Sequence, residues 1–225
     1  MVISIDRKER TKSQLVGAVG KVLMEHGFKE FGVNKVAQAA GVDKALIYRY
    51  FGGLPELVST YSQTVDFWPS VQELLGPSPQ SLAQATPEEQ IAVFFKNFLA
   101  ALRKRPITQE ILAWELLEKN EFSSQLENIR IRTVLEYFDF CENIPDEDFL
   151  PALIVLMSGA INYVIVKSRI SSTIGGIDLE TEEGWEKINN GIDILLKNIF
   201  TSSCKRPSKA IEQPSNDQGA STHDL

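Results

Sequence analysis

The sequence predicts an all-α protein in which a small N-terminal helical domain is followed by a larger helical one. Apolar residues recur at helical spacing along most of the chain, as Leu15 and Val19 do near its start. Helix-start signals recur as well: Thr86 is a cap, Pro87 suits the first helical position and Glu89 stands three places after the cap. No segment shows a convincing strand pattern. With 225 residues, 43% of them hydrophobic, the chain is long enough for one small and one medium domain.

The first helix is predicted over residues 7–27, where His26-Gly27 ends it. Its inward residues have helical spacing: Leu15, Val16, Val19, Val22 and Leu23. No second histidine and no cysteine stands near His26, so we expect no metal site. Four basic residues open the helix, and they can either contact a phosphate backbone or form a solvated face: Arg7, Lys8, Arg10 and Lys12.

A helix-turn-helix is predicted over residues 33–51, with helices at residues 33–40 and 44–51. Two helices that cross steeply need a small residue at the contact and a left-handed residue in the turn, and Ala37 and Gly41 meet these needs. The carboxylate of Asp43 can cap the second helix by accepting from its first free amides. The inward residues of the second helix are then Ile47 and Tyr50.

The outward face of the second helix is basic and aromatic. Lysine and arginine can bond guanine edges or phosphates, a tyrosine hydroxyl reaches phosphate, and an alanine methyl fits against a thymine methyl. The face therefore predicts DNA binding, although a two-helix corner of this kind can also bind protein. Its residues are Lys44, Ala45, Tyr48 and Arg49.

The charge of the chain is divided unevenly. Residues 1–51 hold nine Lys and Arg against five Asp and Glu, a net charge of about +4, within a chain of net charge -7. The remaining residues hold 14 against 25, or about -11. A basic end on an acidic body fits an electrostatic footprint restricted to that end. Chance clustering in a short window is the alternative.

The stretch VNKVAQAAGVDKALIYRYF, followed by GGLPELV, resembles the DNA-binding domain of the TetR family of bacterial transcriptional regulators. The resemblance covers about residues 7–61. It departs from the family at Gly32, where a hydroxyl cap is usual, at Leu46, where a threonine is usual, and at Leu54, where a lysine that approaches phosphate is usual. It also implies that Asn34 reaches a base edge, unless that side chain only solvates the helix start. The predicted DNA-binding residues are Asn34, Lys35, Lys44, Ala45, Leu46, Tyr48 and Arg49.

Beyond the helix-turn-helix the sequence predicts only helices and loops. Pro55 suits a first turn, so a connector helix is expected at residues 56–68 with Leu57, Val58, Tyr61 and Val65 inward. Residues 76–86 and 171–179 are predicted loops. Further helices are expected at residues 87–104, from Pro106 through Leu117, and at residues 121–141, 149–168 and 181–200. In the helix at residues 121–141 the inward residues are Leu126, Ile129, Val134, Leu135 and Phe138.

Residues 149–166 carry no charge over eighteen residues, the lower bound for a membrane span. Pro151, Ser158, Gly159 and Asn162 argue against insertion, and we predict a helix buried on all sides within a protein that does not enter a membrane. The apolar surface of residues 149–166 is also larger than the core of one small domain needs. By the resemblance, residues 149–166 and 188–199 are expected to pair into a four-helix homodimer interface; a monomer with a large internal core is the alternative.

The resemblance implies that a small molecule enters the helical body and releases a palindromic DNA operator. Candidate pocket residues, each of which can also be ordinary core or surface, are Phe94, Phe98, Trp114, Glu115, Tyr137, Phe138, Asn162 and Tyr163, with Glu118 as a further polar anchor.

The predicted divisions are a helix-turn-helix domain at 1–53, a ligand-binding and dimerisation domain at 54–201 and a flexible tail at 202–225. Two alternatives would bind DNA through the same residues: a regulator that responds to no ligand, and an activator.

Other function classes find little support in the sequence. There is no Gly-rich phosphate loop, GxSxG or HExxH motif, so we expect neither an enzyme nor a cofactor. Cys141 and Cys204 lack metal-type spacing and fit a reducing compartment. The first residues contain no apolar signal core, so a cytoplasmic location is expected.

Overall fold

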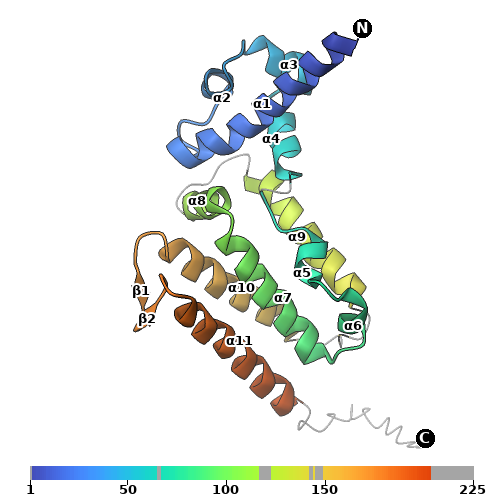
Figure 1. Ribbon diagram of the computed structural model, residues 1–225, viewed down its shortest axis with the longest axis vertical. Coiled ribbons are helices and arrows are strands. Elements are labelled where there is room, and N and C mark those ends of the chain that lie inside the picture. The colour runs from blue at the N-terminus through green and yellow to red at the C-terminus, as the bar shows by residue number, and fades with distance from the viewer. Residues whose placement is uncertain (1, 65–66, 117–122, 142–143, 145–148, 204–225) are drawn as a thin grey trace, which may run out of the picture.

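The computed structural model describes residues 2–64, 67–116, 123–141, 144 and 149–203, and most of them are helical. The elements form an elongated molecule with the N-terminal helices at one end (Figure 1). They are α1 (Val2–His26), α2 (Val33–Ala40), α3 (Ala45–Phe51), α4 (Leu54–Ser62), α5 (Val71–Leu75), α6 (Pro79–Ala83), α7 (Pro87–Arg103), α8 (Pro106–Glu115), α9 (Ser123–Phe140), α10 (Leu150–Lys167), β1 (Thr173–Ile174), β2 (Ile177–Asp178) and α11 (Glu182–Ser203).

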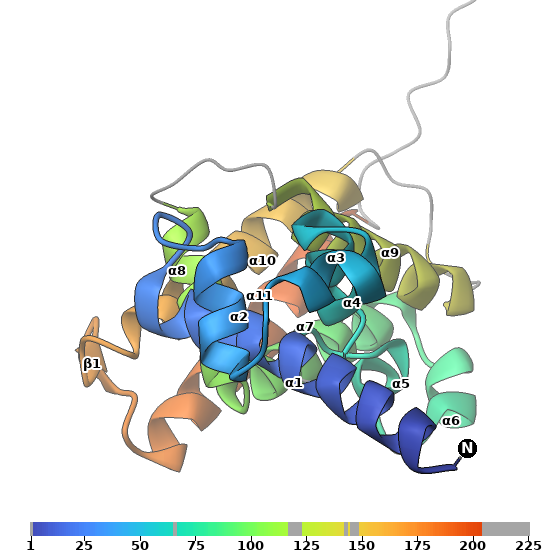
Figure 2. The ribbon, with the colours of Figure 1, turned by 90° about the horizontal axis from the view of Figure 1, so that it is seen from above.

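Helices α1 to α4 form an N-terminal bundle, because each presents its apolar stripe to the others. α1 packs against α2 and α4, and α3 packs against α4. Leu15 and Val19 of α1, Val36 of α2, Ile47 of α3 and Leu57 of α4 are fully buried between them. Figure 2 looks onto this end of the molecule and shows α1, α2 and α3 in front of the body, α5 to α11. The predicted helix at 7–27 is confirmed, although α1 begins earlier.

The predicted connector helix at 56–68 is wrong at its C-terminal end, because α4 stops at Ser62. The carbonyl of Tyr61 accepts from both the amide and the hydroxyl of Thr64, at 2.9 and 2.8 Å, which turns the chain. Phe67 and Trp68 then enter the core, where Phe67 is fully buried. Val65, expected on the inward face, lies outside the described residues.

Part of the predicted loop at 76–86 is helical. Ser78 precedes the one-turn helix α6, which has proline at its start. Leu82 of α6 is buried, and its carbonyl accepts from the Gln90 side-chain amide at 3.0 Å. A second short helix, α5, begins at a reciprocal capping box between Ser70 and Glu73. Both helices are too short for apolar periodicity to reveal them.

The expectation that no strand forms is wrong at one place. β1 and β2 pair in antiparallel register, with Thr173 opposite Asp178. Gly175 and Gly176 connect them with φ values of 56° and 81°, the two left-handed residues that a tight hairpin requires. Two-residue strands carry no alternation, so only the glycine pair signalled the turn.

The helices of the body lie close to their predicted ranges. The capping box predicted for α7 is present: the Thr86 hydroxyl accepts from the Glu89 amide, and the Glu89 carboxylate accepts from the Thr86 amide. α8 ends at Glu115, and Leu117 and Glu118 lie outside the described residues. On α9, Leu126 is buried as predicted, but Leu135 is 58% exposed because it lies on the opposite face. Residues 204–225, most of the predicted tail, also lie outside the described residues.

The prediction that residues 149–166 are buried on all sides is wrong within one chain. α10 is the one helix of the described residues that is long and apolar enough to cross a membrane, with a mean hydropathy of 1.8, yet only 17% of it is buried. Leu153, Ile161 and Ile165 face the body. The opposite face has residues at intervals of three and four, all exposed: Ala152, Val155, Leu156, Gly159, Ala160 and Tyr163.

Candidate nucleic-acid interface

The turn between α2 and α3 has the predicted construction. Gly41 follows α2 with φ 67°, a left-handed conformation, and its amide donates to carbonyls at the end of that helix. Ala37, the small residue at the crossing, is 4% exposed. The Asp43 carboxylate accepts from the amide of Ala45 at 2.7 Å, which caps the start of α3. These contacts fix the direction in which α3 leaves the bundle.

Helix α3 divides into a buried side and an exposed side. Ile47 is fully buried, whereas Tyr48 is 57% exposed. Lys44, Ala45 and Arg49 are exposed too, as predicted. The exposed side therefore offers two cations, an aromatic hydroxyl and a methyl group, all of which suit contacts with a DNA groove and its phosphates.

Two of the predicted residues at the start of α2 are held by other side chains. The ammonium of Lys44 donates to the Asn34 side-chain oxygen at 3.3 Å, which links the two helices across the turn. Lys35 pairs with Glu30 at 3.0 Å, and this hydrogen bond lowers the pKa of the Glu30 carboxyl. Asn34 thus keeps its amide group available as a donor, while Lys35 must leave Glu30 to reach a phosphate.

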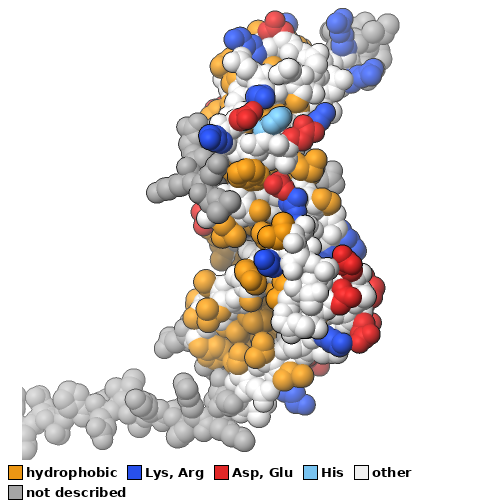
Figure 3. Space-filling model, turned by 90° about the vertical axis from the view of Figure 1, so that its left-hand side faces the viewer, with side chains coloured by type: hydrophobic (Ala, Val, Ile, Leu, Met, Phe, Trp, Pro, Cys, Tyr) orange, Lys and Arg blue, Asp and Glu red, His pale blue; other side chains and the backbone are white. Residues whose placement is uncertain are grey.

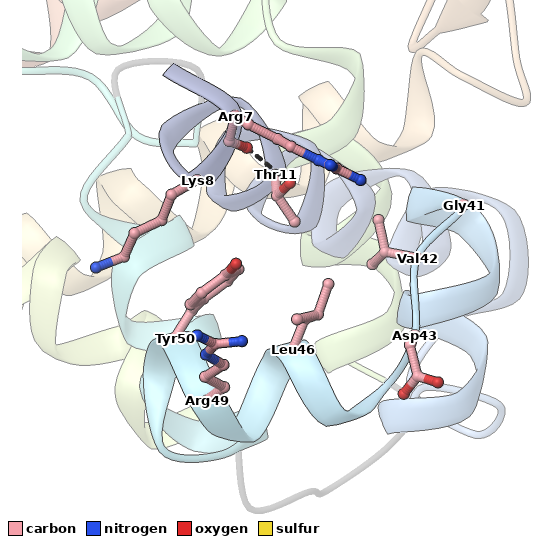
Figure 4. A pocket seen from close by; sticks show the side chains of 9 residues that line it. All are labelled: Arg7, Lys8, Thr11, Gly41, Val42, Asp43, Leu46, Arg49 and Tyr50. Carbon is pink, nitrogen blue, oxygen red and sulfur yellow. Dashed lines mark hydrogen bonds between the residues drawn. The ribbon is translucent and has the colours of Figure 1, made fainter. Parts of the chain in front are cut away.

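Leu46 does not lie on the exposed face with its neighbours. It is half-buried and lines a cleft of about 550 Å³ between the N-terminal half of α1 and helix α3. Figure 4 shows this cleft with Arg7 and Lys8 on the α1 side and Arg49 and Tyr50 on the α3 side.

The cleft holds two cations near one aromatic ring, and a third cation, Arg7, also lines it. The Lys8 ammonium lies 5.9 Å from the centre of the Tyr50 ring, and the Arg49 guanidinium carbon lies 5.8 Å from it. Arg7 and Lys8 are exposed, so the cleft is open to an anion the size of a phosphate. The sequence left the basic residues of α1 with two interpretations, and it gave Tyr50 only an inward role; the proximity of α1 to α3 could not be read from spacing.

The predicted ligand-pocket residues separate into distinct places. Four of them belong to one aromatic cluster around the Phe94 ring, whose centre lies 6.0 Å from Phe98, 4.9 Å from Tyr137 and 5.5 Å from Phe138. The Tyr137 hydroxyl donates to the Gln90 carbonyl at 2.7 Å. Tyr163 is 57% exposed on the outer face of α10, so its assignment to an internal pocket is wrong.

The other three candidates lie on α8 and α10. Trp114 packs against Gly27 at the end of α1, where a Cβ on that glycine would come within 2.6 Å of the indole. Glu115 pairs with Arg130 of α9 at 2.6 Å. Asn162 is half-buried, and its side-chain oxygen has no hydrogen-bond partner within the described part of the chain.

Comparison with known proteins decides what the N-terminal bundle is. Residues 15–59 match the family model for bacterial regulatory proteins of the tetR family. The chain carries a tetR-family DNA-binding domain. The match spans the end of α1, the helix-turn-helix and most of α4, so the resemblance inferred from the sequence is confirmed.

Most of the chain has a fold similar to that of solved TetR-like transcriptional regulators. A fatty acid degradation regulator from Bacillus halodurans, FadR, is 17% identical with a TM-score of 0.53, covering 83% of this chain and 94% of that chain. Native NalD of Pseudomonas aeruginosa, the secondary repressor of the MexAB-OprM multidrug efflux pump, is 18% identical with a TM-score of 0.54, covering 73% of this chain and 89% of that chain. A TetR-like transcriptional regulator from Rhodococcus sp. RHA1 is 20% identical with a TM-score of 0.53, covering 87% of this chain and 97% of that chain. No curated protein matches the sequence.

Proposed function

We propose that this tetR-family protein is a cytoplasmic, homodimeric repressor that binds a palindromic DNA operator and is released from it by a small molecule. The exposed basic and aromatic side of α3, on a domain of this family, is the observation that carries the proposal. α3 enters the major groove, where Arg49 and Lys44 contact guanine edges or phosphates and Ala45 lies against a thymine methyl. Tyr48 donates to a phosphate.

The cleft beside α3 supplies a phosphate contact from a second helix. Arg7 and Lys8 of α1 stand across it from Arg49, so a backbone phosphate bound there is contacted from both helices. Such contacts hold α3 in register on the duplex but do not read sequence. Lys35 and Asn34 contact the strand on the other side of the groove once Lys35 exchanges Glu30 for phosphate.

Selection of bound sequences from random duplex DNA tests the proposal directly. We expect a consensus of two inverted half-sites whose centres are one helical turn or a multiple of it apart, because a two-fold dimer presents two copies of α3. An affinity that falls steeply with salt is expected at the same time, since phosphate contacts release counterions. Absence of binding to every duplex at low salt refutes the DNA-binding role and favours protein recognition by the helix-turn-helix.

The dimer uses the exposed side of α10 together with α11. The stripe that includes Val155, Leu156 and Tyr163 continues on α11, where Ile194 and Leu195 are 61% and 53% exposed. Figure 3 shows hydrophobic side chains gathered over the lower half of the molecule, at the level of these helices. A patch of this kind is costly in water and is covered when two copies pair their α10 and α11 helices.

A charge placed in this stripe tests the dimer. Nothing lies within 4 Å of a Cβ on Gly159, so Gly159→Glu leaves the single chain intact and places a carboxylate where we expect the partner to pack. The variant should elute as a monomer in size-exclusion chromatography with light scattering. Asn128→Glu on the exposed side of α9 is the matched control and should remain dimeric. A Gly159→Glu dimer places the interface elsewhere.

Release by a ligand requires that the ligand bind the non-operator conformation more tightly than the operator-bound one. Reporter measurements with the operator upstream of a promoter, with and without added compounds, determine the sign of regulation. A signal that rises when the protein is deleted supports a repressor. A signal that falls indicates an activator.

A further inference from the structure

The described part of the chain contains an arginine whose hydrogen-bonding edge is buried and unused. Arg130 of α9 donates to Glu115 through Nη1 at 2.6 Å. Its Nε and Nη2 are buried without a partner, and so is the second oxygen of Glu115. Nε and Nη2 form the edge on which a guanidinium binds a carboxylate through two parallel hydrogen bonds. Buried donors are almost always satisfied, so this edge needs an explanation.

The surroundings of Arg130 are aromatic and partly open. Its guanidinium carbon lies 5.6 Å from the centre of the Phe67 ring and 5.1 Å from that of Trp68. The side chains of Arg130 and Glu115 are 18% and 13% exposed as a whole, but Nε and Nη2 of Arg130 are buried, so a ligand reaches this edge when neighbouring side chains move aside. Trp68 and Ile129 also line a cleft of about 340 Å³ between the end of α4 and α9, with room for part of a small ligand.

Arg130 also stands where the body meets the DNA-binding domain. Phe67 follows the last turn of α4 and contacts Tyr61 of that helix at 5.6 Å between ring centres. Thr108 of α8 donates to the Phe67 carbonyl. At the other end of α8, Trp114 precedes Glu115 and packs against Gly27 of α1. Arg130 therefore joins the two segments, the turn after α4 and the end of α8, that contact the DNA-binding domain.

We propose that Arg130 binds the carboxylate of an organic acid on its Nε and Nη2 edge, with the apolar part of that acid against Trp68 in the cleft beside α9. This inference rests on the proposed release by a small molecule and names the ligand class. A second carboxylate on Arg130 shares one positive charge with Glu115, which weakens the bond to Nη1. The end of α8 is then released, and with it the contact of Trp114 on Gly27. Burial raises the pKa of the Glu115 carboxyl, although Arg130 opposes this effect. Glu115 therefore takes up a proton more readily when it loses Arg130, which makes that loss less costly.

Isothermal titration of the full chain with five acids and their matched primary amides tests the assignment. The probes are benzoate, naphthalene-2-carboxylate, indole-3-acetate, hexanoate and octanoate. We expect at least one acid to bind saturably and its amide to bind at least about tenfold more weakly, because the charge-assisted pair is lost. Failure of all five acids to bind, or equal binding of acid and amide, overturns the proposal.

Two arginine variants separate recognition from general charge. Arg130→Met should bring acid binding to the level of the amide. Arg103→Met is the control, because Arg103 also stacks on a tryptophan, Trp185, but both of its terminal nitrogens already donate to Glu182; its acid binding should be unchanged. If Arg130→Met does not fold, Arg130→Lys retains the charge without the two-donor edge and should lose most of the preference. A preference retained in the variant that folds refutes the site.

The operator selected from random duplexes provides the second readout. The acid that binds should weaken operator affinity of the wild type at least about tenfold, and that of Arg130→Met much less. If the protein binds no duplex, the DNA-binding proposal fails regardless of the titration. If it binds DNA but no acid, only the present inference fails.

Discussion

The DNA-binding domain and the body each leave one helix face uncovered, and the two faces differ in chemistry. The uncovered residues of α3 include Tyr48 and Arg49, with Lys44 just before the helix, whereas those of α10 include Val155 and Leu156. A hydrated, anionic duplex suits the first face, and a second copy of an apolar helix suits the second. Burial within one chain does not separate these cases. The side-chain type on the exposed face does, and it indicates two different partners.

The two regions also differ in what determines their helices. In the DNA-binding domain the turn depends on residues adjacent in sequence, such as Gly41 and Asp43. In the body, short helices are also held by distant residues: Leu74 of α5 is buried, and its carbonyl accepts from the Asn97 side chain of α7 at 2.8 Å. Substitutions in the body core should therefore affect stability most, and substitutions on α3 should affect binding most.

The largest effect is expected from Phe94→Ala in the aromatic cluster of the body. Phe94 is 1% exposed and contacts four other rings. Removal of a buried phenyl ring loses its transfer free energy and leaves a cavity, so the free energy of unfolding should fall by about 3 to 5 kcal/mol. Urea denaturation followed by circular dichroism measures it. Phe140→Ala, at a site 36% exposed, should cost much less; equal losses contradict the core assignment.

Much of the fold was predictable because helix signals are local. The boundaries of α2 match the prediction, and α3 and α7 begin and end within one residue of it, since a glycine, a cap or a proline marks them. The end of α4, helices α5 and α6 and the β-hairpin were missed. Local signals were present, such as the capping box of Ser70 with Glu73 and the pair Gly175-Gly176, but these elements are too short for periodicity, and their formation also depends on tertiary contacts such as the burial of Phe67 and Leu82.

The candidate DNA-binding site was also predictable in part, where its residues belong to one helix. The exposed side of α3 follows from helical spacing once Ile47 is placed inward. The cleft with Arg7 and Lys8 required knowledge of how α1 crosses α3, and the half-buried position of Leu46 came from the same crossing. In the body, Tyr163 was placed in a pocket because aromatic residues are common in both cores and interfaces, and sequence spacing does not distinguish them.

The second largest effect concerns DNA binding and should leave stability unchanged. Arg49→Ala and Tyr48→Ala should each weaken operator binding by about 1 to 3 kcal/mol, because each removes one anchor to a base or phosphate. Fluorescence anisotropy with the selected operator measures the affinity. Lys21→Ala removes an exposed charge elsewhere on α1 and should change it little. Unchanged affinity in both α3 variants shows that this face does not contact DNA.

A smaller effect is expected at the turn that orients α3. Gly41→Ala places a Cβ on a residue with φ 67°, which should cost about 1 to 2 kcal/mol of stability although the space is open. Gly17→Ala is the matched control, because Gly17 lies within α1 and its Cβ also meets nothing within 4 Å. That substitution should stabilise the protein by about 0.5 to 1 kcal/mol. Thermal unfolding of both variants distinguishes backbone strain from crowding, and a stabilised Gly41→Ala contradicts the left-handed turn.

The smallest effect distinguishes the two regions by pH. Burial raises the pKa of the Cys141 thiol in the body, so the folded state holds the proton where the unfolded state releases it. This contribution to stability is complete below about pH 8.5, the unfolded value, and is lost as the pH rises through the folded value. Between pH 7 and pH 9 the loss should reach at most about 0.8 kcal/mol.

Urea denaturation of the wild type and Cys141→Ala at both pH values isolates this loss, because the other ionisable groups are common to the two proteins. The variant should lose less stability between pH 7 and pH 9 than the wild type does. No such dependence is expected from the Glu30 carboxyl of the DNA-binding domain, since Lys35 lowers its pKa and it is already ionised at pH 7. An identical pH dependence in variant and wild type shows that the thiol ionises as readily in the folded body as in the unfolded chain.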